Sequence, residues 1–309
     1  MAAKIAVVGS MNMDLVARAH HIPEPGETIV GRDFRMVPGG KGANQAVAAA
    51  RLGAKVMMVG RVGNDPFAAQ LLQNLDKDGI DHRFVFQDIE EATGVALIMV
   101  DESGQNSILV AAGANYRLSV QDIESARSAI EEADVLLVQL ENPVNTILRA
   151  VQIGHAAGVI VILNPAPARP VPEELLSLAD FVIPNEPETT MMTGLPVNEL
   201  NQAGIAAARL VEMGARQVII TLGKRGCYFC NQTTSKYFQA FRVNAIDTTA
   251  AGDAFLGGFA VALAENQPIE YAIKWGRASG ALAATRMGAQ PSLPNREEVL
   301  QLISNQMID

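Results

Sequence analysis

Short runs of aliphatic residues alternate along the chain with stretches in which apolar residues recur at helical spacing. Each run is bounded by Gly, Pro, Asn or Asp, and its unbroken hydrophobicity is typical of a strand buried on both faces of a parallel sheet. The pattern therefore predicts an α/β fold. The predicted strands are residues 5–8, 56–59, 135–140, 159–163, 181–183 and 218–221.

Several helix boundaries carry local signals. Ser119 precedes apolar residues at helical spacing and is a candidate N-cap. Asn142 stands directly before a proline, which predicts an N-cap followed by proline at the first helical position. Gly158 and Gly214 follow helical stretches, so we expect them to end those helices.

Two segments, 14–38 and 94–111, interrupt the alternation of strands and helices. The second contains two apolar runs on either side of a turn-like D-E-S-G-Q-N, which predicts antiparallel pairing. A small sheet built from both segments would lie over the carboxyl ends of the parallel strands and act as a lid. A surface decoration without motion is the alternative. The sequence shows no internal repeat and no clear linker between domains, so residues 1–309 are expected to form a single domain.

Composition narrows the class of partner. The chain has 309 residues, 49% hydrophobic and 18% charged, which is enough for a substantial core. Its formal charge of −9, without a basic run, argues against a nucleic-acid or anionic-membrane partner and favours a small molecule. The longest aliphatic runs are too short to span a membrane, so we expect a cytoplasmic protein.

The two cysteines, Cys227 and Cys230, lie in a strand-like segment. In an extended chain, positions i and i+3 point to opposite faces of the sheet. A shared metal or a redox pair is therefore not expected.

Residues 243–264 carry the strongest chemical signal. Ala250, Ala251 and Gly252 open an apolar helix, so unpaired N–H groups and the helix dipole create a site for an anion at its first turn. Asp253 stands at the same place, and a carboxylate beside a bound phosphate suggests a base. The alternative is a core helix in which Asp253 only complements the dipole.

A second motif, P-G-G-K-G-A-N-Q-A, covers residues 38–46. Its glycines allow the backbone to approach a ligand, and Lys41 and Asn44 supply donors. The spacing fits neither a Walker A loop nor a dinucleotide fingerprint, which excludes hydride chemistry of that type.

Together, G-G-K-G-A-N-Q-A and D-T-T-A-A-G-D-A-F-L-G-G resemble the two signatures of the ribokinase-like (PfkB) carbohydrate kinases. The resemblance spans nearly the whole chain and implies a three-layer sandwich with a mostly parallel sheet and a small antiparallel β lid. Further matching pieces are G-S-M-N-M-D at 9–14, P-G-E-T at 25–28, A-G-A-N at 112–115, Q-L-E-N-P at 139–143, N-P-A-P-A at 164–168 and G-A-Q-P-S at 288–292.

The resemblance also implies a sugar site. Amide, carboxylate and backbone groups would replace the water lost by a polyol and reject analogues that lack a hydroxyl. Taken alone, Asp14 is more simply explained as a turn or strand-end residue and Glu141 as a helix-start residue. The implied sugar-binding residues are Asn12, Asp14, Gly40, Lys41, Gly42, Asn44, Glu141 and Asp253.

On the nucleotide side, the resemblance implies ATP binding and a magnesium ion. Glu188 would organise Mg²⁺ through water, although residues 185–188 could also simply start a helix. Arg277 departs from the family, whose ribokinases commonly have His or Asn near the adenine at this position. The implied ATP-binding residues are Asn185, Thr221, Gly223, Lys224, Arg225, Gly226, Gly252 and Arg277.

A monovalent cation, usually K⁺, activates such kinases, and a cage of oxygen atoms suits this weakly hydrated ion. Asp247 alone could be an ordinary turn residue. The implied ligands are Asp247 and the hydroxyl of Ser292, with backbone oxygens of Thr249, Ala283, Arg286 and Gly288.

The implied reaction is ATP-dependent phosphorylation of D-ribose at its 5-hydroxyl. Asp253 would be the general base, with backbone N–H groups of residues 250–253 stabilising the transferred phosphoryl group. Another pentose or a nucleoside is an alternative substrate, and a non-catalytic sugar or nucleotide sensor is an alternative function. The edges and apolar face of the lid suggest a homodimer.

Overall fold

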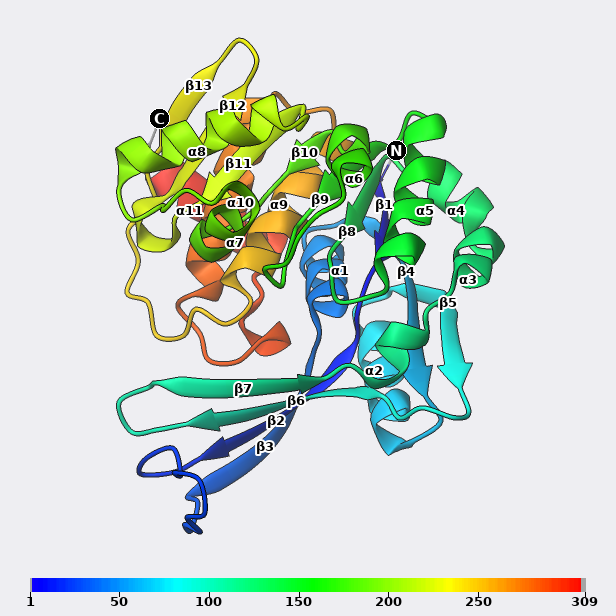
Figure 1. The fold of residues 1–309 in the computed structure, drawn as a ribbon, viewed down its shortest axis with the longest axis vertical. Helices are drawn as coiled ribbons and strands as arrows, with labels where there is room; N and C mark the ends of the chain where they lie inside the picture. Colours follow the sequence, from blue (N-terminus) through cyan, green and yellow to red (C-terminus); the bar gives the residue numbers. More distant parts are fainter. Residues whose placement is uncertain (1, 307–309) are drawn as a thin grey trace.

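A computed structural model of the protein describes residues 2–306. A nine-stranded sheet crosses the larger part of the molecule in the order β13-β12-β11-β10-β9-β8-β1-β4-β5 (Figure 1). In this sheet, neighbouring strands from β11 to β5 pair in parallel. The remaining pairs, β11 with β12 and β12 with β13, are antiparallel. The strands are β1 Lys4–Val8, β4 Lys55–Gly63, β5 Asp81–Asp88, β8 Val135–Val138, β9 Ile160–Leu163, β10 Phe181–Val182, β11 Gln217–Thr221, β12 Cys227–Asn231 and β13 Ser235–Phe238.

Helices cover both faces of this sheet and give three layers, as predicted. One face carries α1 Lys41–Arg51, α2 Pro66–Lys77, α9 Ala251–Ala264, α10 Ile269–Ala283 and α11 Arg296–Asn305. The other carries α3 Val120–Ser125, α4 Arg127–Glu131, α5 Val144–Ala156, α6 Glu173–Leu178, α7 Glu186–Thr193 and α8 Leu200–Glu212. Short 3₁₀ turns are η1 Gly113–Arg117, η2 Gly223–Arg225 and η3 Gln290–Ser292.

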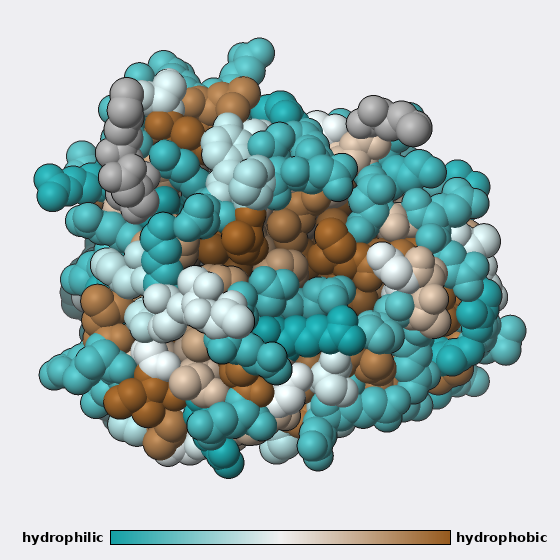
Figure 2. Space-filling view, turned by 90° about the horizontal axis from the view of Figure 1, so that it is seen from above, coloured by the Kyte–Doolittle hydropathy of each residue, from teal (hydrophilic) through white to brown (hydrophobic). Residues whose placement is uncertain are grey.

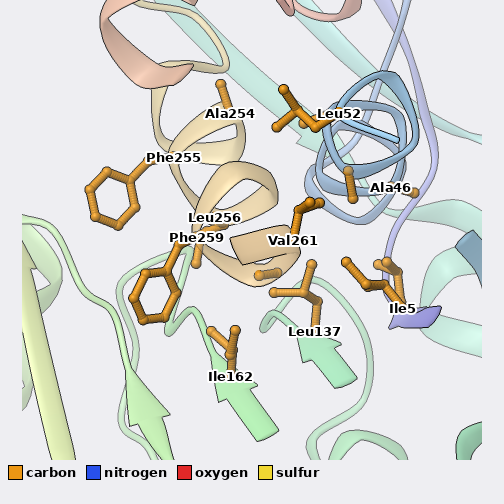
Figure 3. Packing of buried hydrophobic residues seen from close by; sticks show 14 of the residues in the cluster. Ile5, Ala46, Leu52, Leu137, Ile162, Ala254, Phe255, Leu256, Phe259 and Val261 are labelled. Atoms are coloured by element: carbon orange, nitrogen blue, oxygen red, sulfur yellow. The ribbon is translucent and has the colours of Figure 1, made fainter. Parts of the chain in front are cut away.

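The apolar helix α9 is packed into the core on one face of the sheet. Phe259 points towards Ile162 of the sheet, whereas Val261 points towards α1, which lies alongside α9 (Figure 3). A Cβ atom on Gly257 would lie 2.5 Å from the Cβ of Ala48 in α1, so glycine is required for this close approach. Because the buried part of α9 packs against the sheet and against α1 (Figure 3), the first turn of α9 has a fixed position.

The smaller sheet projects from the carboxyl ends of the parallel strands (Figure 1), where the sequence predicts a lid. Its order is β3-β2-β6-β7, with antiparallel outer pairs and a parallel central pair, β2 with β6. The side chain of Asp101 accepts from the backbone N–H groups of Ser103 and Gln105 and so forms the predicted turn. The strands are β2 Asn12–Arg18, β3 Asp33–Gly39, β6 Gly94–Val100 and β7 Asn106–Ala111.

The local predictions hold with one correction. Ser119 caps α3, and Gly158 and Gly214 follow the ends of α5 and α8 with positive φ angles of 76° and 108°. Asn142, however, is not the N-cap of α5, which is Pro143 without a side-chain cap. The amide of Asn142 instead donates to the carbonyl of Asn115 over 3.0 Å, a tertiary contact that local sequence cannot reveal.

The two cysteines of β12 lie on opposite faces of the sheet, as predicted. Cys227 belongs to the core on the α9 side, and Cys230 to the core on the α5 side. Seen from the end opposite the lid, the surface is largely hydrophilic around a central hollow with hydrophobic walls (Figure 2). Within residues 2–306, no helix has the length and apolar character that crossing a membrane demands.

Candidate active site

Four segments meet at the carboxyl ends of the parallel strands, where the lid begins. β1 continues through residues 9–11 into β2, and the glycine loop at the end of β3 leads into α1. The segment after β8 supplies Glu141, and the first turn of α9 supplies Asp253. Asp14 of β2 interacts electrostatically with both of these carboxylates, so residues far apart in sequence share one site.

Glycines let the loop before α1 approach the start of β2 closely. Gly40 has a φ of 88°, in the left-handed region that favours glycine. A Cβ atom on Gly40 would lie 2.7 Å from the amide nitrogen of Asn12, and one on Gly42 would lie 2.6 Å from that of Ser10. The predicted sugar ligands of the two segments are therefore held side by side.

Asp253 is buried, and both of its carboxylate oxygens accept hydrogen bonds. The side-chain amide of Asn44 donates to Oδ2 over 3.0 Å, and that of Gln45 donates to Oδ1 over 3.0 Å. Burial raises the pKa of Asp253 above its ordinary value, although the charge of Lys41 and the two amide hydrogen bonds oppose the shift. The carboxylate is thus oriented and has an increased affinity for a proton, as a general base requires.

Charged side chains influence one another on the sugar side. Burial, followed by the charges of Glu141 and Asp253, raises the pKa of Asp14 from 3.8 to about 7. Burial acts to lower the pKa of Lys41, but the nearby carboxylates, foremost Asp253 and Glu141, raise it overall. Sugar hydroxyls can donate to such carboxylates and accept from the ammonium group, so the cluster suits a polyol.

The burial of Asp14 predicts a pH-dependent effect on stability. We expect Asp14→Asn to raise the free energy of unfolding of the sugar-free protein by about 2–4 kcal/mol at about pH 8, and much less at about pH 4.5. Since the folded-state pKa lies above the unfolded value, the native state binds more protons, and its stability falls as pH rises from about 4 to about 7. Urea unfolding at both pH values measures the difference, and equal effects would contradict the prediction.

Backbone donors at the start of α9 are available to an anion. Among the described residues, the N–H groups of Ala250, Gly252 and Asp253 have no hydrogen-bond partner, whereas that of Ala251 donates to the carbonyl of Thr248 over 3.2 Å. A Cβ atom on Gly252 would meet nothing within 4 Å, so open space lies before these donors. This arrangement fits a phosphoryl group.

A cavity of about 600 Å³ lies beside the start of α9, and its walls are more apolar than polar. This combination suits a nucleotide, whose base is largely apolar on its faces. Arg225 is not part of the wall, because its guanidinium bonds Glu186 over 2.8 Å. The other predicted nucleotide residues line the cavity together: Asn185, Thr221, Gly223, Lys224, Gly226, Gly252 and Arg277.

Arg277 has an unusual setting in this wall. It is buried, its guanidinium lies 5.3 Å from the ring centre of Phe238 and 5.4 Å from that of Phe241, and Nη1 donates to the carbonyl of Gln239. Burial lowers the pKa of Arg277. Through these contacts, the Arg277 side chain stabilises the segment that forms one wall of the cavity.

Asn185 and Glu188 hold the start of α7 by reciprocal hydrogen bonds. The Asn185 side chain accepts from the Glu188 N–H, and the Glu188 carboxylate accepts from the Asn185 N–H, each over 2.9 Å. Both residues also line a polar cavity that they share with Lys41 and Asp253. The second carboxylate oxygen of Glu188 has no partner among the described residues, so it can accept from the water shell of Mg²⁺.

The predicted potassium ligands come from two adjacent segments. Thr249 and Gly288 donate their N–H groups to opposite oxygens of Asp247, over 2.9 and 2.8 Å. Burial acts to raise the pKa of Asp247, but the hydrogen bonds from the Thr249 hydroxyl and from these two N–H groups lower it overall, which keeps the carboxylate ionised. An ionised carboxylate can contribute to the binding of a monovalent cation. The other predicted ligands, Ala283, Arg286 and Ser292, lie in or next to the second segment.

Comparison with known proteins identifies the family. A family model described as "pfkB family carbohydrate kinase" matches residues 2–296. The chain belongs to the pfkB family of carbohydrate kinases. Within this family, a ribokinase of Haemophilus influenzae is 42% identical over 301 residues, which cover 97% of this chain and 98% of that protein. A deoxyribokinase of Salmonella typhi is 38% identical over 301 residues, with 97% and 98% coverage.

Solved pfkB-type structures share the architecture. A ribokinase of Arabidopsis thaliana, complexed with ribose and ATP, superposes with a TM-score of 0.90 at 34% identity, covering 98% of this chain and 99% of that one. The likeness confirms the predicted family, the large mostly parallel sheet with its small second sheet, and the prediction of a sugar kinase.

Three polar residues of this pfkB site were not among the predicted site residues. Ser10 donates its hydroxyl to the Glu141 carboxylate, and Asn115 donates to the Oδ1 atom of Asn12 over 2.8 Å. Gln45 bonds Asp253, as described above. All three lie inside the matching motifs, so the motifs contained a signal, but only the folded structure reveals what each side chain contacts.

Proposed function

We propose that this pfkB kinase transfers the γ-phosphoryl group of ATP to the 5-hydroxyl of D-ribose. One observation carries the proposal: a buried, oriented Asp253 stands between a cluster of sugar-type ligands and free backbone donors beside a nucleotide-sized cavity. A binding protein that only senses a sugar or a nucleotide needs neither the base nor the anion site.

On the sugar side, Asn12, Asp14, Lys41, Asn44 and Glu141 bind the hydroxyl groups, together with the backbone of Gly40 and Gly42. The lid favours a bare sugar over a nucleoside. Asp14, Ala96 and Val110 are neighbours in register across β2, β6 and β7, so they occupy the same face of the lid. Apolar Ala96 and Val110 side chains beside Asp14 cover the sugar and leave little room for a second ring.

In the proposed reaction, Asp253 removes the proton from the primary hydroxyl of the sugar. The resulting oxygen attacks the γ-phosphorus in line, the bond from phosphorus to the β,γ-bridging oxygen breaks, and ADP leaves. The free N–H groups of Ala250, Gly252 and Asp253 stabilise the charge on the transferred phosphoryl oxygens.

Two cations would support these residues. Glu188 would reach a nucleotide-bound Mg²⁺ through water, and the charge of that ion would offset phosphate charge. Asp247 and backbone oxygens of the adjacent segment would hold a monovalent cation, whose charge would help to orient the loop before α9.

A panel of substrates tests the assignment of D-ribose. Deoxyribose is a specific second candidate, because one relative is a deoxyribokinase. We expect kcat/KM with Mg-ATP and K⁺ to be at least about 10-fold higher for D-ribose than for 2-deoxy-D-ribose, because polar ligands would lose a hydroxyl partner. Ribonucleosides and other pentoses complete the panel, and ³¹P NMR locates the phosphate in the product. Preference for deoxyribose or nucleosides would replace the ribose assignment.

We also propose that the chain works as a single-domain cytoplasmic enzyme and as a homodimer joined through its lid. Leu15, Met36, Leu97 and Leu109 are neighbours in register on the lid face opposite Asp14. The side chains of Met36, Leu97 and Leu109 are 48%, 46% and 60% exposed. The lid of a second copy would bury these apolar side chains. Analytical ultracentrifugation of the intact protein and of a Leu97→Glu, Leu109→Glu variant tests this contact.

A further inference from the structure

Behind Asp253 lies a chain of buried side-chain amides that the proposed reaction does not yet use. Gln45 Nε2 donates to Asp253 Oδ1 over 3.0 Å and lies 3.4 Å from Asn164 Oδ1. Gln139 Nε2 in turn donates to Gln45 Oε1 over 2.6 Å. Neither glutamine is exposed to solvent. The catalytic carboxylate is thus connected through Gln45 to the residue that follows β8.

The chemistry of the amides determines which way each one faces. If Gln45 turned its amide over, its oxygen would face the Asp253 carboxylate and its NH₂ group would face that of Gln139. The observed orientation avoids both repulsions. Gln139 can only fix Gln45 in this way by directing its own NH₂ group towards it.

This orientation has a cost at Gln139. The Oε1 atom of Gln139 is buried and has no hydrogen-bond partner among the described residues. Leaving a buried acceptor unpaired costs about 1–3 kcal/mol. A Cβ atom on Gly9 would collide with this same oxygen, so glycine at this position leaves room for the amide. Such a cost at a reaction site suggests a function for the arrangement.

We propose that Gln45 and Gln139 are positioning residues that orient Asp253 and keep it ready to accept the proton of the sugar. Gln45 fixes one carboxylate oxygen, while Gln139 fixes the Gln45 amide and touches neither substrate nor base. The inference rests on the proposed function, in which Asp253 is the base. It adds two residues behind Asp253 that hold its carboxylate in the orientation and protonation state that the reaction requires.

A change in pH dependence is the signature of this role. The charged groups facing Asp253 are Lys41 of α1, Glu141 after β8, Asp14 of the lid and Glu188 of α7. The Gln45 hydrogen bond acts with Lys41 to lower the pKa of Asp253 against the effect of burial. Removing that bond therefore favours protonated Asp253, and the acid limb of the rate profile moves to higher pH.

The test uses full-length Gln45→Met, which keeps the volume but removes both hydrogen bonds, and Gln139→Met, which leaves the contact with Asp253 in place. We expect Gln45→Met to lower kcat at neutral pH by about 10- to 10²-fold with less than about a 3-fold change in sugar KM, and to shift the acid limb upwards by about one pH unit. Gln139→Met should produce a smaller change in the same direction.

Thr146→Val is a matched control, because the Thr146 hydroxyl is buried and donates only to the carbonyl of Leu118 over 2.9 Å. It should lower stability without moving the pH profile. If Gln45→Met and Gln139→Met keep the profile of the unaltered enzyme while Asp253→Asn is inactive, the positioning role is wrong and the proposed function stands. If Asp253→Asn is fully active, the proposed function itself fails.

Discussion

Asp253→Asn is expected to lower kcat for sugar phosphorylation by about 10²- to 10⁴-fold while sugar affinity changes little. The amide has nearly the shape of the carboxylate but cannot accept the proton of the primary hydroxyl. Other polar groups, among them Asp14, Lys41 and Glu141, remain to bind the sugar. A coupled assay of ADP formation gives kcat, and calorimetry gives the affinity for D-ribose without nucleotide.

The same pair of measurements separates a base from a sugar ligand. Loss of sugar binding with little loss of kcat at saturating sugar would assign Asp253 to substrate binding. Equal rates for the variant and the unaltered protein would exclude the proposed mechanism. An intact protein that binds sugar and nucleotide but forms no ADP would support a sensor.

Gly252→Ala is expected to reduce kcat/KM for ATP by about 10²-fold or more while the protein stays as stable as before or becomes slightly more stable. The added methyl group would enter open space before the free N–H groups, where we place the transferred phosphoryl group. Alanine also suits the first turn of a helix, because it costs less conformational entropy than glycine. Steady-state kinetics with varied ATP and a thermal unfolding curve measure the two effects.

Gly40→Ala provides the contrast. Gly40 has a φ of 88°, and its added Cβ atom would lie 2.7 Å from the Asn12 amide nitrogen. This variant should lose both stability and sugar binding, because the added methyl group strains the packed glycine loop before α1. A Gly252→Ala enzyme with unchanged ATP kinetics would show that the open space before α9 does not receive the phosphoryl group.

Some parts of the fold were predictable because they depend on local chemistry. The aliphatic runs became the central strands within a few residues of the predicted bounds, since strands buried on both faces need continuous hydrophobicity. β5 and β13 were not predicted, because edge strands are half exposed and carry mixed residues such as those of Asp81–Asp88. Asn142 shows the limit of local signals, since its amide bonds Asn115 across the fold instead of capping α5.

The sequence proposed the residues of the candidate site but not their arrangement. Motifs pointed to Asp14, Lys41, Glu141 and Asp253, because a polyol and a phosphate need these residue types at such loops. That Asp253 is buried against Gln45 depends on contacts across 208 positions, and no local pattern encodes such contacts. The position of Arg225 outside the cavity wall has the same origin, since Glu186 binds its guanidinium.

The sequence by itself determined the α/β class, the two segments of the smaller sheet, the family resemblance and the residue types of the candidate site. These follow from hydrophobic periodicity and short motifs, which act within a few neighbouring residues. Only the tertiary structure decided the parallel pairing of β2 with β6, the free N–H groups before α9 and the amide chain behind Asp253. Each requires segments far apart in sequence to meet at one edge of the sheet, where burial and neighbouring charges set the chemistry.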